Sequence, residues 1–503
     1  MTRVKSLVVK SWGDKRSGVK RLLAGGAALT LLLGACSLAP PLKTPVIPAG
    51  DAYKEGGAWT QAQPADRLPR DSWWTLYGNA ELDSLQTQLI AANPTLAAAF
   101  ANYAQARALA DQARAGLFPT LGLNAGVQRS RESVNAPLIS SAVPRYFDTN
   151  VLGGSVSYEL DLWGQIRNEV KAGEANAAAA AADLENARLS LIAQLVNDYI
   201  QLRSLDRSSK ILDDTVTAYA RALGLTEQRH GAGIAPGLDV SQAQTQLDAA
   251  RSQASQTLAQ RALMEHAIAA LLGVSASTFS IERAIVDIKQ PQVPTGLPAT
   301  LLQRRPDIAA AQRRMMAANA NIGVARAAYF PSLTLAGSGG VESTSFSNWL
   351  TAPSTFWAIG PNALLTVFDG GLRKAQVAQA RAEFDASAAN YRGTVVSAFQ
   401  QVEDSLATLN YDSQAALQEK AAVDAAQRTL DFSLALYVQG AADYLTVVTS
   451  QTALLQTQLT ALNLDTLQLQ ASVNLILALG GGWEDSPDAL KRQGKMADAR
   501  NPG

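Results

Sequence analysis

The sequence predicts a mostly α-helical protein with a smaller β component, built from two similar halves. Residues 113–123 read ARAGLFPTLGL and residues 325–335 read ARAAYFPSLTL, and the two segments align without a gap at a constant offset (325 − 113 = 212). Each half also contains a long proline-free stretch, at 165–230 and at 372–437. Such stretches are typical of long helices, whereas the alternation that follows each Phe-Pro pair is typical of strands.

The first part of the chain carries most of its positive charge. Seven of its first 35 residues are basic and one, Asp14, is acidic, so 43 − 7 = 36 basic and 43 − 1 = 42 acidic residues remain. The body therefore has a net charge of about −6, which argues against nucleic-acid binding because that requires a basic face.

Residues 1–35 have the pattern of an export signal, with a basic region before the short apolar run 22–35. The sequence Leu-Gly-Ala-Cys that ends at Cys36 resembles the lipobox of bacterial lipoproteins, which implies cleavage before Cys36 and lipid, including palmitate, on that residue. Ser37 favours the outer membrane under the usual sorting rule. The alternative is a signal peptide followed by a free thiol. Beyond Cys36, no apolar run reaches the length of about 18 residues that a transmembrane helix needs.

The elements of the first half follow in order. Residues 36–80 form a proline-rich tether and an equatorial segment, in which Trp73, Trp74 and Tyr77 are candidates for an aromatic anchor. The first structural repeat spans 81–290. Its predicted elements are a helix at 81–117 interrupted at Asn93-Pro94, strands at about 118–130 and 150–162 around a polar loop, and helices at 165–230 and 238–272.

The second structural repeat spans 291–483 and restarts the same plan. Its predicted elements are a helix at about 299–328, strands at about 331–342 and 356–368, and a helix from 372 to about 437 with another beyond it; residues 484–503 form a polar tail. Phe118-Pro119 and Phe330-Pro331 occupy matched positions and predict helix-to-strand junctions, since proline cannot continue a helix.

The four predicted strands have about the length that crosses a bilayer when tilted. Four strands cannot close a barrel, and open strand edges cannot lie in lipid. We therefore expect the strands to be shared between protomers. A dimer would contribute eight strands and a trimer twelve, which is wide enough for a lumen.

Residues 301–335, LLQRRPDIAAAQRRMMAANANIGVARAAYFPSLTL, resemble the signature of TolC-type outer-membrane efflux channels, in their NodT- or OprM-like lipoprotein branch. The segments 437–440 and 479–483 extend this resemblance to nearly the whole chain. It implies a homotrimer with a 12-stranded transmembrane β-barrel in the outer membrane of a Gram-negative cell, above a long α-helical coiled-coil tunnel in the periplasm.

The resemblance also implies a function in antibiotic resistance. The chain would be the outer-membrane channel of a tripartite efflux pump, a passive gated conduit for drugs or other small molecules. Its partners would be a periplasmic adaptor and an inner-membrane pump of the RND type. The alternatives are the exit duct of a type I protein-secretion system, or a periplasmic coiled-coil lipoprotein without a pore.

The family places the closed periplasmic aperture at the helix breaks, which are Gly233 and Gly440 in this chain (440 − 233 = 207). Tyr437 matches a family tyrosine that holds the aperture shut, with Asp239 as its expected acceptor. The alternative is that Asp239 caps its helix and Tyr437 only packs. Thr449 stands where family members carry a lumen-facing aspartate, so Asp443 is a candidate substitute at another height.

The remaining polar motifs favour structural roles. Arg305-Pro306-Asp307 has the pattern of a helix start. Glu159, Asp161 and Glu342 are expected on the lumen side of the strands, and Glu403 on a solvated or lumen-facing helix surface. His230 and His266 lack metal-ligand partners at a suitable spacing, and the common nucleotide-binding and hydrolase motifs are absent from the sequence. We therefore expect no enzyme activity, no metal and no cofactor beyond the lipid on Cys36.

Overall fold

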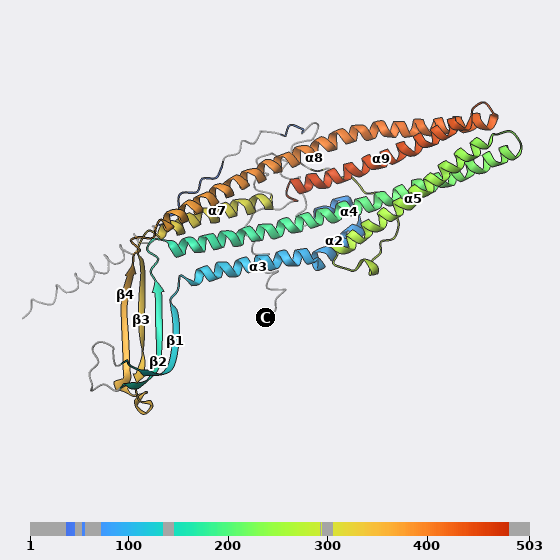
Figure 1. The fold of residues 1–503 in the computed structure, drawn as a ribbon. Helices are drawn as coiled ribbons and strands as arrows, with labels where there is room; N and C mark the ends of the chain where they lie inside the picture. The colour runs from blue at the N-terminus through green and yellow to red at the C-terminus, as the bar shows by residue number, and fades with distance from the viewer. Residues whose placement is uncertain are drawn as a thin grey trace, which may run out of the picture. The chain divides into compact units, whose positions relative to one another are not determined.

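The computed structural model describes residues 37–45, 53–55, 72–133, 145–291, 293 and 305–481 (Figure 1). It divides into two compact units, and each unit takes segments from both halves of the sequence. The first contains residues 1–44, 105–178 and 313–389, and the second contains 45–104, 179–312 and 390–503. Cys36 lies outside the described residues, so its predicted lipid remains a prediction.

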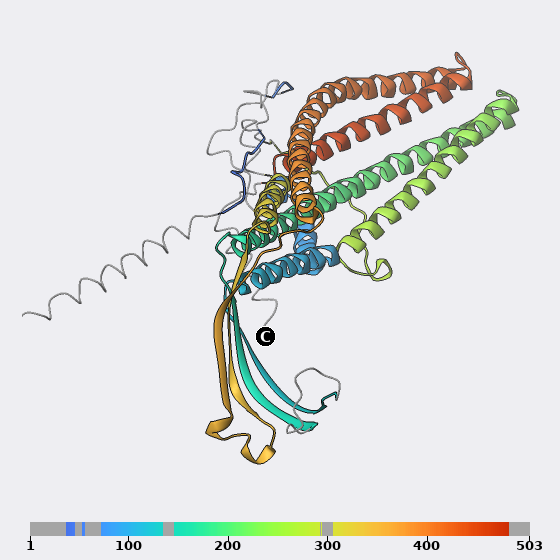
Figure 2. The ribbon, with the colours of Figure 1, turned by 60° about the vertical axis from the view of Figure 1, so that its left-hand side comes forward.

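The first unit holds a four-stranded antiparallel sheet. Its strands are β1 (Thr120–Arg131), β2 (Tyr146–Glu159), β3 (Ser332–Ser343) and β4 (Thr355–Leu364). They lie in the order β1-β2-β3-β4, as Figure 2 shows, so each half of the sequence contributes one hairpin. The halves meet where β2 pairs with β3, with Ser157 opposite Ala336.

Several strand boundaries differ from those that the sequence predicted: β1 begins at Thr120 rather than near residue 118, and β2 ends at Glu159 rather than near residue 162. β2 begins at Tyr146 rather than near residue 150, because Tyr146 pairs with Arg131 at the far end of β1. The polar loop is shorter accordingly. β4 ends at Leu364 rather than near residue 368, because β3 begins at Ser332, directly opposite Leu364. Residues 365–368 extend past the strand that would have paired with them in this chain.

The outer strand β1 is exposed along almost its whole length. Every residue from Thr120 to Arg131 except Ser130 is exposed, and the fractions for Leu121 and Leu123 are 79% and 92%. A soluble protein rarely leaves such a row of large apolar side chains uncovered. We therefore expect this apolar row to be covered, either by a non-aqueous medium or by another chain.

The described residues also form α-helices, four of which are long. The helices are α2 (Ala80–Ala92), α3 (Pro94–Ala115), α4 (Gln165–Gly231), α5 (Gly237–Leu271), α7 (Pro306–Ala327), α8 (Leu372–Gln439) and α9 (Tyr444–Ala478). These bounds match the predicted helices closely, except that α7 begins at Pro306 and not near residue 299; residues 299–304 lie outside the described residues. The predicted break at Asn93-Pro94 is confirmed, since Asn93 separates α2 from α3 and its side chain accepts a hydrogen bond from the amide of Leu96. Among the described residues, we find no helix that combines the length and hydropathy needed to cross a membrane.

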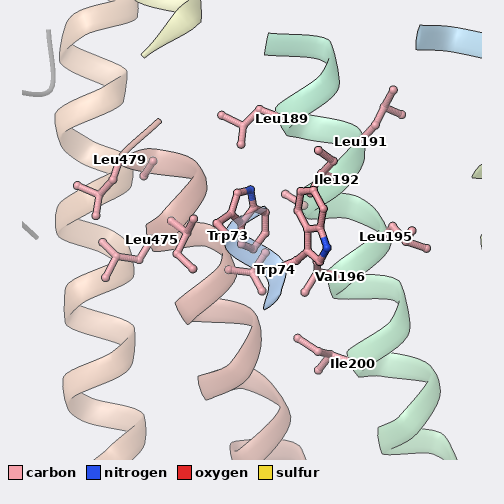
Figure 3. Packing of buried hydrophobic residues seen from close by; sticks show 14 of the residues in the cluster. Trp73, Trp74, Leu189, Leu191, Ile192, Leu195, Val196, Ile200, Leu475 and Leu479 are labelled. Carbon is pink, nitrogen blue, oxygen red and sulfur yellow. The ribbon is translucent and has the colours of Figure 1, made fainter. Parts of the chain in front are cut away.

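The main hydrophobic core lies in the second unit and confirms the predicted aromatic anchor. Trp73, Trp74 and Tyr77 form a short 3-10 helix whose three aromatic side chains are buried. Figure 3 shows the two indoles between α4, which contributes Leu195, and the end of α9, which contributes Leu475. The Tyr77 hydroxyl hydrogen-bonds with Ser472 at 2.8 Å. This short helix therefore joins elements from the two halves of the sequence.

The same unit contains a buried cluster of charges that connects α4 with α5. The guanidinium groups of Arg203 and Arg261 donate to Asp206 at 2.7 and 2.6 Å, and the side chain of Asp206 is 1% exposed. Arg203 also pairs with Glu81 of α2, and Arg261 pairs with Glu265. Because each buried charge has an opposite charge beside it, the cluster fixes the relative positions of the three helices.

Part of the predicted tether is docked. Residues 37–44, which we call the strap, lie along α4 and α7 within the first unit. Ser37 donates to Asn168 Oδ1 at 3.0 Å, and Asn319 and Arg326 donate to the carbonyls of Pro40 and Leu38. Because residue 38 bonds near the end of α7 and residue 40 bonds two turns earlier, the strap runs antiparallel to α7.

Candidate functional site

The candidate site is the pair of tight turns at the ends of the two helical hairpins, α4–α5 and α8–α9. Gly233 has a φ of 73° and Gly440 a φ of 76°. In the first turn, Ile234 donates to the carbonyl of Arg229, and in the second, Ala441 donates to that of Leu436. These are matching Schellman motifs, in which glycine supplies the left-handed residue that ends the helix. The structure thus places both predicted tip glycines at equivalent turns.

A hydrogen bond joins the two hairpins within one or two helical turns of these tips. The Tyr437 hydroxyl of α8 donates to Asp239 Oδ2 of α5 at 3.1 Å. Both side chains are buried, at 3% and 8% exposure. Asp239 therefore does not act as the cap of α5, whose N-cap position is Pro236. The expected pairing of tyrosine with aspartate is present in this chain.

Arg229 completes the contact, and the sequence did not predict its part in it. Its guanidinium lies 4.8 Å from the centre of the Tyr437 ring and donates to the Val438 carbonyl at 3.0 Å. A cation over a phenol ring is attracted to the ring face. The sequence feature that could have identified Arg229 is its position as a basic residue in the last turn of α4, two positions before Gly231. We call Arg229, Asp239 and Tyr437 the tip lock.

An apolar cluster surrounds the tip lock. Tyr444 meets the Tyr437 ring edge-on with centroids 5.2 Å apart, and Ala243 and Val447 pack beside them. Burial and the neighbouring Asp239 raise the pKa of Tyr437, and burial raises the pKa of Tyr444 to about 12. Both phenols are therefore neutral at physiological pH, and Tyr437 keeps the proton that it donates.

The other predicted aperture residues have local partners. Asp443 is the N-cap of α9 and accepts from the amide and hydroxyl of Thr446, and these hydrogen bonds lower the pKa of its carboxyl group. The Thr449 hydroxyl is exposed and donates to the Thr446 carbonyl. Asp443 thus already has a capping role, and its proposed part in an acidic ring stays a prediction.

The Phe-Pro junctions differ in their surroundings. Phe330 stacks on Trp163 with ring centres 4.6 Å apart, and the indole Nε1 donates to the Pro331 carbonyl at 2.8 Å. Phe118 is 69% exposed. Both prolines precede a strand, since β1 begins at Thr120 and β3 at Ser332. The second junction is therefore packed on one side, with Phe330 40% exposed, whereas the first presents its ring outward.

Two carboxylates expected on lumen-facing or solvated surfaces have other partners. Asp161 lies beyond the end of β2, where it accepts from the amides of Ile166 and Arg167 and pairs with the Arg167 side chain at 3.0 Å. It is an anchor for the start of α4, not a residue of the strand face. Glu403 accepts from the backbone amides of Lys54 and Glu55, so it holds a second piece of the N-terminal tether.

The Arg-Pro-Asp motif has a structural role. The Arg305 guanidinium forms two hydrogen bonds with Asp307 and donates to Gln401 and to the Ala478 carbonyl at the end of α9. It therefore ties the start of α7 to α8 and α9. Glu159 and Glu342 lie at the ends of β2 and β3, and their expected place on the lumen side stays a prediction.

These features agree with one class of protein, the efflux channels of the outer membrane. A family model described as outer membrane efflux protein matches residues 85–274 and 297–481. The chain belongs to this family.

Individual proteins agree with this assignment. The chain is 32% identical over 471 residues to the pyoverdine export outer membrane protein OpmQ of Pseudomonas aeruginosa, covering 92% of this chain and 97% of that protein. It is 30% identical over 474 residues to the toluene efflux pump outer membrane protein TtgC of Pseudomonas putida, covering 93% and 97%. The solved outer-membrane channel OprN shares 28% identity at a TM-score of 0.83, covering 89% of this chain and 100% of OprN.

The protein is thus an efflux component of the Gram-negative outer membrane. The relatives named above are an outer-membrane protein of an efflux pump, an export protein of the outer membrane and an outer-membrane channel. Its fold, in which strands for the membrane continue into long helices, is the one expected from the sequence.

Proposed function

We propose that the protein is the outer-membrane channel of a tripartite efflux pump and acts as a passive, gated conduit without catalytic activity. Three copies would close their sheets into a 12-stranded barrel, and their helical hairpins would form the tunnel below it. The observation that carries the gate is the buried hydrogen bond from Tyr437 to Asp239, because it ties one hairpin to the other at the tips.

Opening requires the two hairpins to separate at this point. Separation exposes the Asp239 carboxylate and removes Arg229 from the Tyr437 ring, so the closed state is favoured in the resting protein. Contacts of this kind contribute about 1–3 kcal/mol each. A periplasmic adaptor that binds the separated tips better than the closed ones would shift the equilibrium toward the open channel.

The energy for transport comes from an inner-membrane pump of the RND type in this proposal. The chain is anchored at the membrane by lipid on Cys36 as well as by its strands. The docked strap supports this anchor, because it runs antiparallel to α7 and so directs its first residues toward the strand-bearing end of that helix.

Small organic molecules are the proposed cargo. The relatives named for their cargo export toluene and pyoverdine, which differ widely in polarity. A conduit that encloses its cargo without a dedicated binding pocket would tolerate such a range.

The test is complementation in a strain that lacks this gene, with drug susceptibility as the readout. Wild-type protein should restore resistance to several unrelated small molecules, and deletion of the partner pump should abolish that effect. Secretion of a protein substrate that depends on this chain, with no change in drug susceptibility, would instead support the exit duct of a secretion system.

A further inference from the structure

The sheet has two open edges, and its internal repeat specifies how they join. Among the described strands, β1 is the edge strand on one side of the sheet and β4 is the edge strand on the other. This inference rests on the proposed trimer and goes beyond it: we propose that β4 of one protomer pairs antiparallel with β1 of the next in a single register, with Leu364 opposite Asn124 of the neighbouring copy.

The two hairpins give the correspondence between the halves. Thr120 is opposite Ser157 in the first hairpin, and Ser332 is opposite Leu364 in the second. Ser332 is the repeat counterpart of Thr120, since 332 − 120 = 212 is the offset of the Phe-Pro junctions. Leu364 is therefore the counterpart of Ser157, at an offset of 364 − 157 = 207. This second offset is also the one between Gly233 and Gly440.

The pairing of β2 with β3 is the template for the pairing of β4 with β1 of the next copy. In the internal repeat, β4 is the counterpart of β2 and β1 is the counterpart of β3. The pairing of β2 with β3 within a chain therefore corresponds to a pairing of β4 with β1 between chains. Ser157 is opposite Ala336 in the pairing within the chain. The counterpart of Ser157 is Leu364, and the offset of the Phe-Pro junctions makes Asn124 the counterpart of Ala336 (336 − 212 = 124).

The directions of the backbone groups support this register independently. Leu160 donates its amide to the Leu333 carbonyl, so even-numbered residues of β2 point toward β3. Alternation along each strand then makes the odd-numbered residues of β1 and β4 point outward at the open edges. Pro361, which has no N–H, is odd-numbered, so it breaks no bond within the chain, and the proposed pairing between copies lacks one bond where Pro361 faces Val127 of the next copy. The register pairs odd with odd residues, so the outward groups of the two edges meet.

The side chains agree with the same register. It sets Leu123 opposite Leu365 and Leu121 opposite Val367, so exposed apolar residues of both edges share one face. Their exposed fractions in the single chain are 92%, 49%, 79% and 89%. A shift of the register by one residue would place the apolar side chains of one strand on the same face as the small and polar side chains of the other. The register also gives residues 365–367, which have no strand partner within the chain, a partner in the next copy.

Disulfide trapping in the full-length protein in outer membranes tests the register. The double variant Asn124→Cys with Leu364→Cys should cross-link between copies on mild oxidation and give a band of three chain masses on a non-reducing gel. Within one chain these positions lie at opposite edges of the sheet. A paired position without direct hydrogen bonds brings the two Cα atoms to about 4.5 Å, within disulfide range.

Matched controls keep Leu364→Cys and move its partner by two residues on the same face. Gly126→Cys and Gly122→Cys each increase the separation to about 7–8 Å, beyond an unstrained disulfide. An added Cβ at Gly126 meets nothing within 4 Å, so that variant should fold. We expect about ten-fold more cross-linked trimer from the Asn124 pair than from either control.

Equal or stronger cross-linking in a control would overturn the register, as would the absence of cross-linking in all three variants. Conductance of each purified variant distinguishes a wrong register from a wrong assignment as a trimeric channel. Conducting protein that cross-links in another register contradicts only this inference, whereas neither conductance nor cross-linking contradicts the proposed trimeric channel too.

Discussion

The indole of Trp163 stacks on the ring of Phe330 with centres 4.6 Å apart, and so joins the end of the first hairpin to the start of the second. The same indole donates to the Pro331 carbonyl at 2.8 Å. The helix-to-strand junction of the second half is thus held by a residue of the first half. This explains how two hairpins from distant parts of the chain keep one register.

Replacing Trp163 should weaken the sheet. Trp163→Ala removes both the stacking and the hydrogen bond, and we expect a loss of about 2–4 kcal/mol in the free energy of unfolding. Trp163→Phe keeps an aromatic ring and should lose about 1 kcal/mol. Thermal unfolding in detergent, followed by circular dichroism, compares the two. Equal stability of Trp163→Ala and wild type would contradict the role assigned to this contact.

The buried charge cluster should be sensitive to the loss of its central carboxylate. Asp206→Asn leaves the guanidinium groups of Arg203 and Arg261 without that charge, and we expect destabilisation of about 3–5 kcal/mol. The control is Asp214→Asn, which breaks the exposed pair with Lys210 and should cost about 0.5 kcal/mol or less. Denaturant unfolding of the detergent-solubilised protein measures both. Similar small effects would show that the cluster does not hold α4 and α5 together.

Asp198 should make stability depend on pH. Burial raises the pKa of its carboxyl to about 6, and its Oδ2 atom is buried without a hydrogen-bond partner. Because the folded state holds this proton more tightly than the unfolded state, the ionised carboxylate destabilises the fold as the pH rises from about 4 to above 6.

Asp198→Asn should therefore stabilise the protein at pH 7.5. We expect about 1–2 kcal/mol after allowing for partial exposure, and the gain should shrink as the pH falls toward 4. Melting temperatures of variant and wild type across this range provide the measurement. A gain that grows at low pH would have the wrong sign for this explanation.

Gly323 should be needed for docking of the strap. A Cβ atom at this position would lie 2.5 Å from Asn168 Nδ2 and 2.9 Å from the Ala39 amide nitrogen. Gly323→Ala should therefore increase proteolysis within the strap and lower the melting temperature. The control Gly224→Ala, also within a helix, meets nothing within 4 Å and should stabilise by up to about 1 kcal/mol. Stabilisation by both substitutions would refute the close packing of the strap.

The sequence predicted the helices well because their signals are local. Proline, glycine and the repeat marked the ends of α4 and α8 and both tip turns. The pairing of Tyr437 with Asp239 was expected only through the family resemblance, since these residues are 198 positions apart. Arg229, the anchoring role of Asp161 and the docking of residues 54 and 55 on Glu403 depend on tertiary contacts. No periodicity in a single sequence reports such contacts.

The end of β4 shows a different limit. Alternation continues through residues 365–367, and the sequence accordingly predicted a longer strand. The structure ends β4 at Leu364 because β3 provides no partner beyond Ser332. A hydrophobic pattern records which residues suit a strand, whereas the bounds of a strand in one chain depend on the neighbour that pairs with it.

Single-channel conductance in planar bilayers shows whether the tip lock holds the conduit shut. Purified wild-type protein should show small or rare openings, and Asp239→Ala should raise the mean conductance several-fold by removing the acceptor of Tyr437. Asp443→Ala, which removes only the cap of α9, should stay close to wild type. Absence of channels in every variant would contradict the conduit, and equal conductance of Asp239→Ala and wild type would contradict the tip lock as its gate.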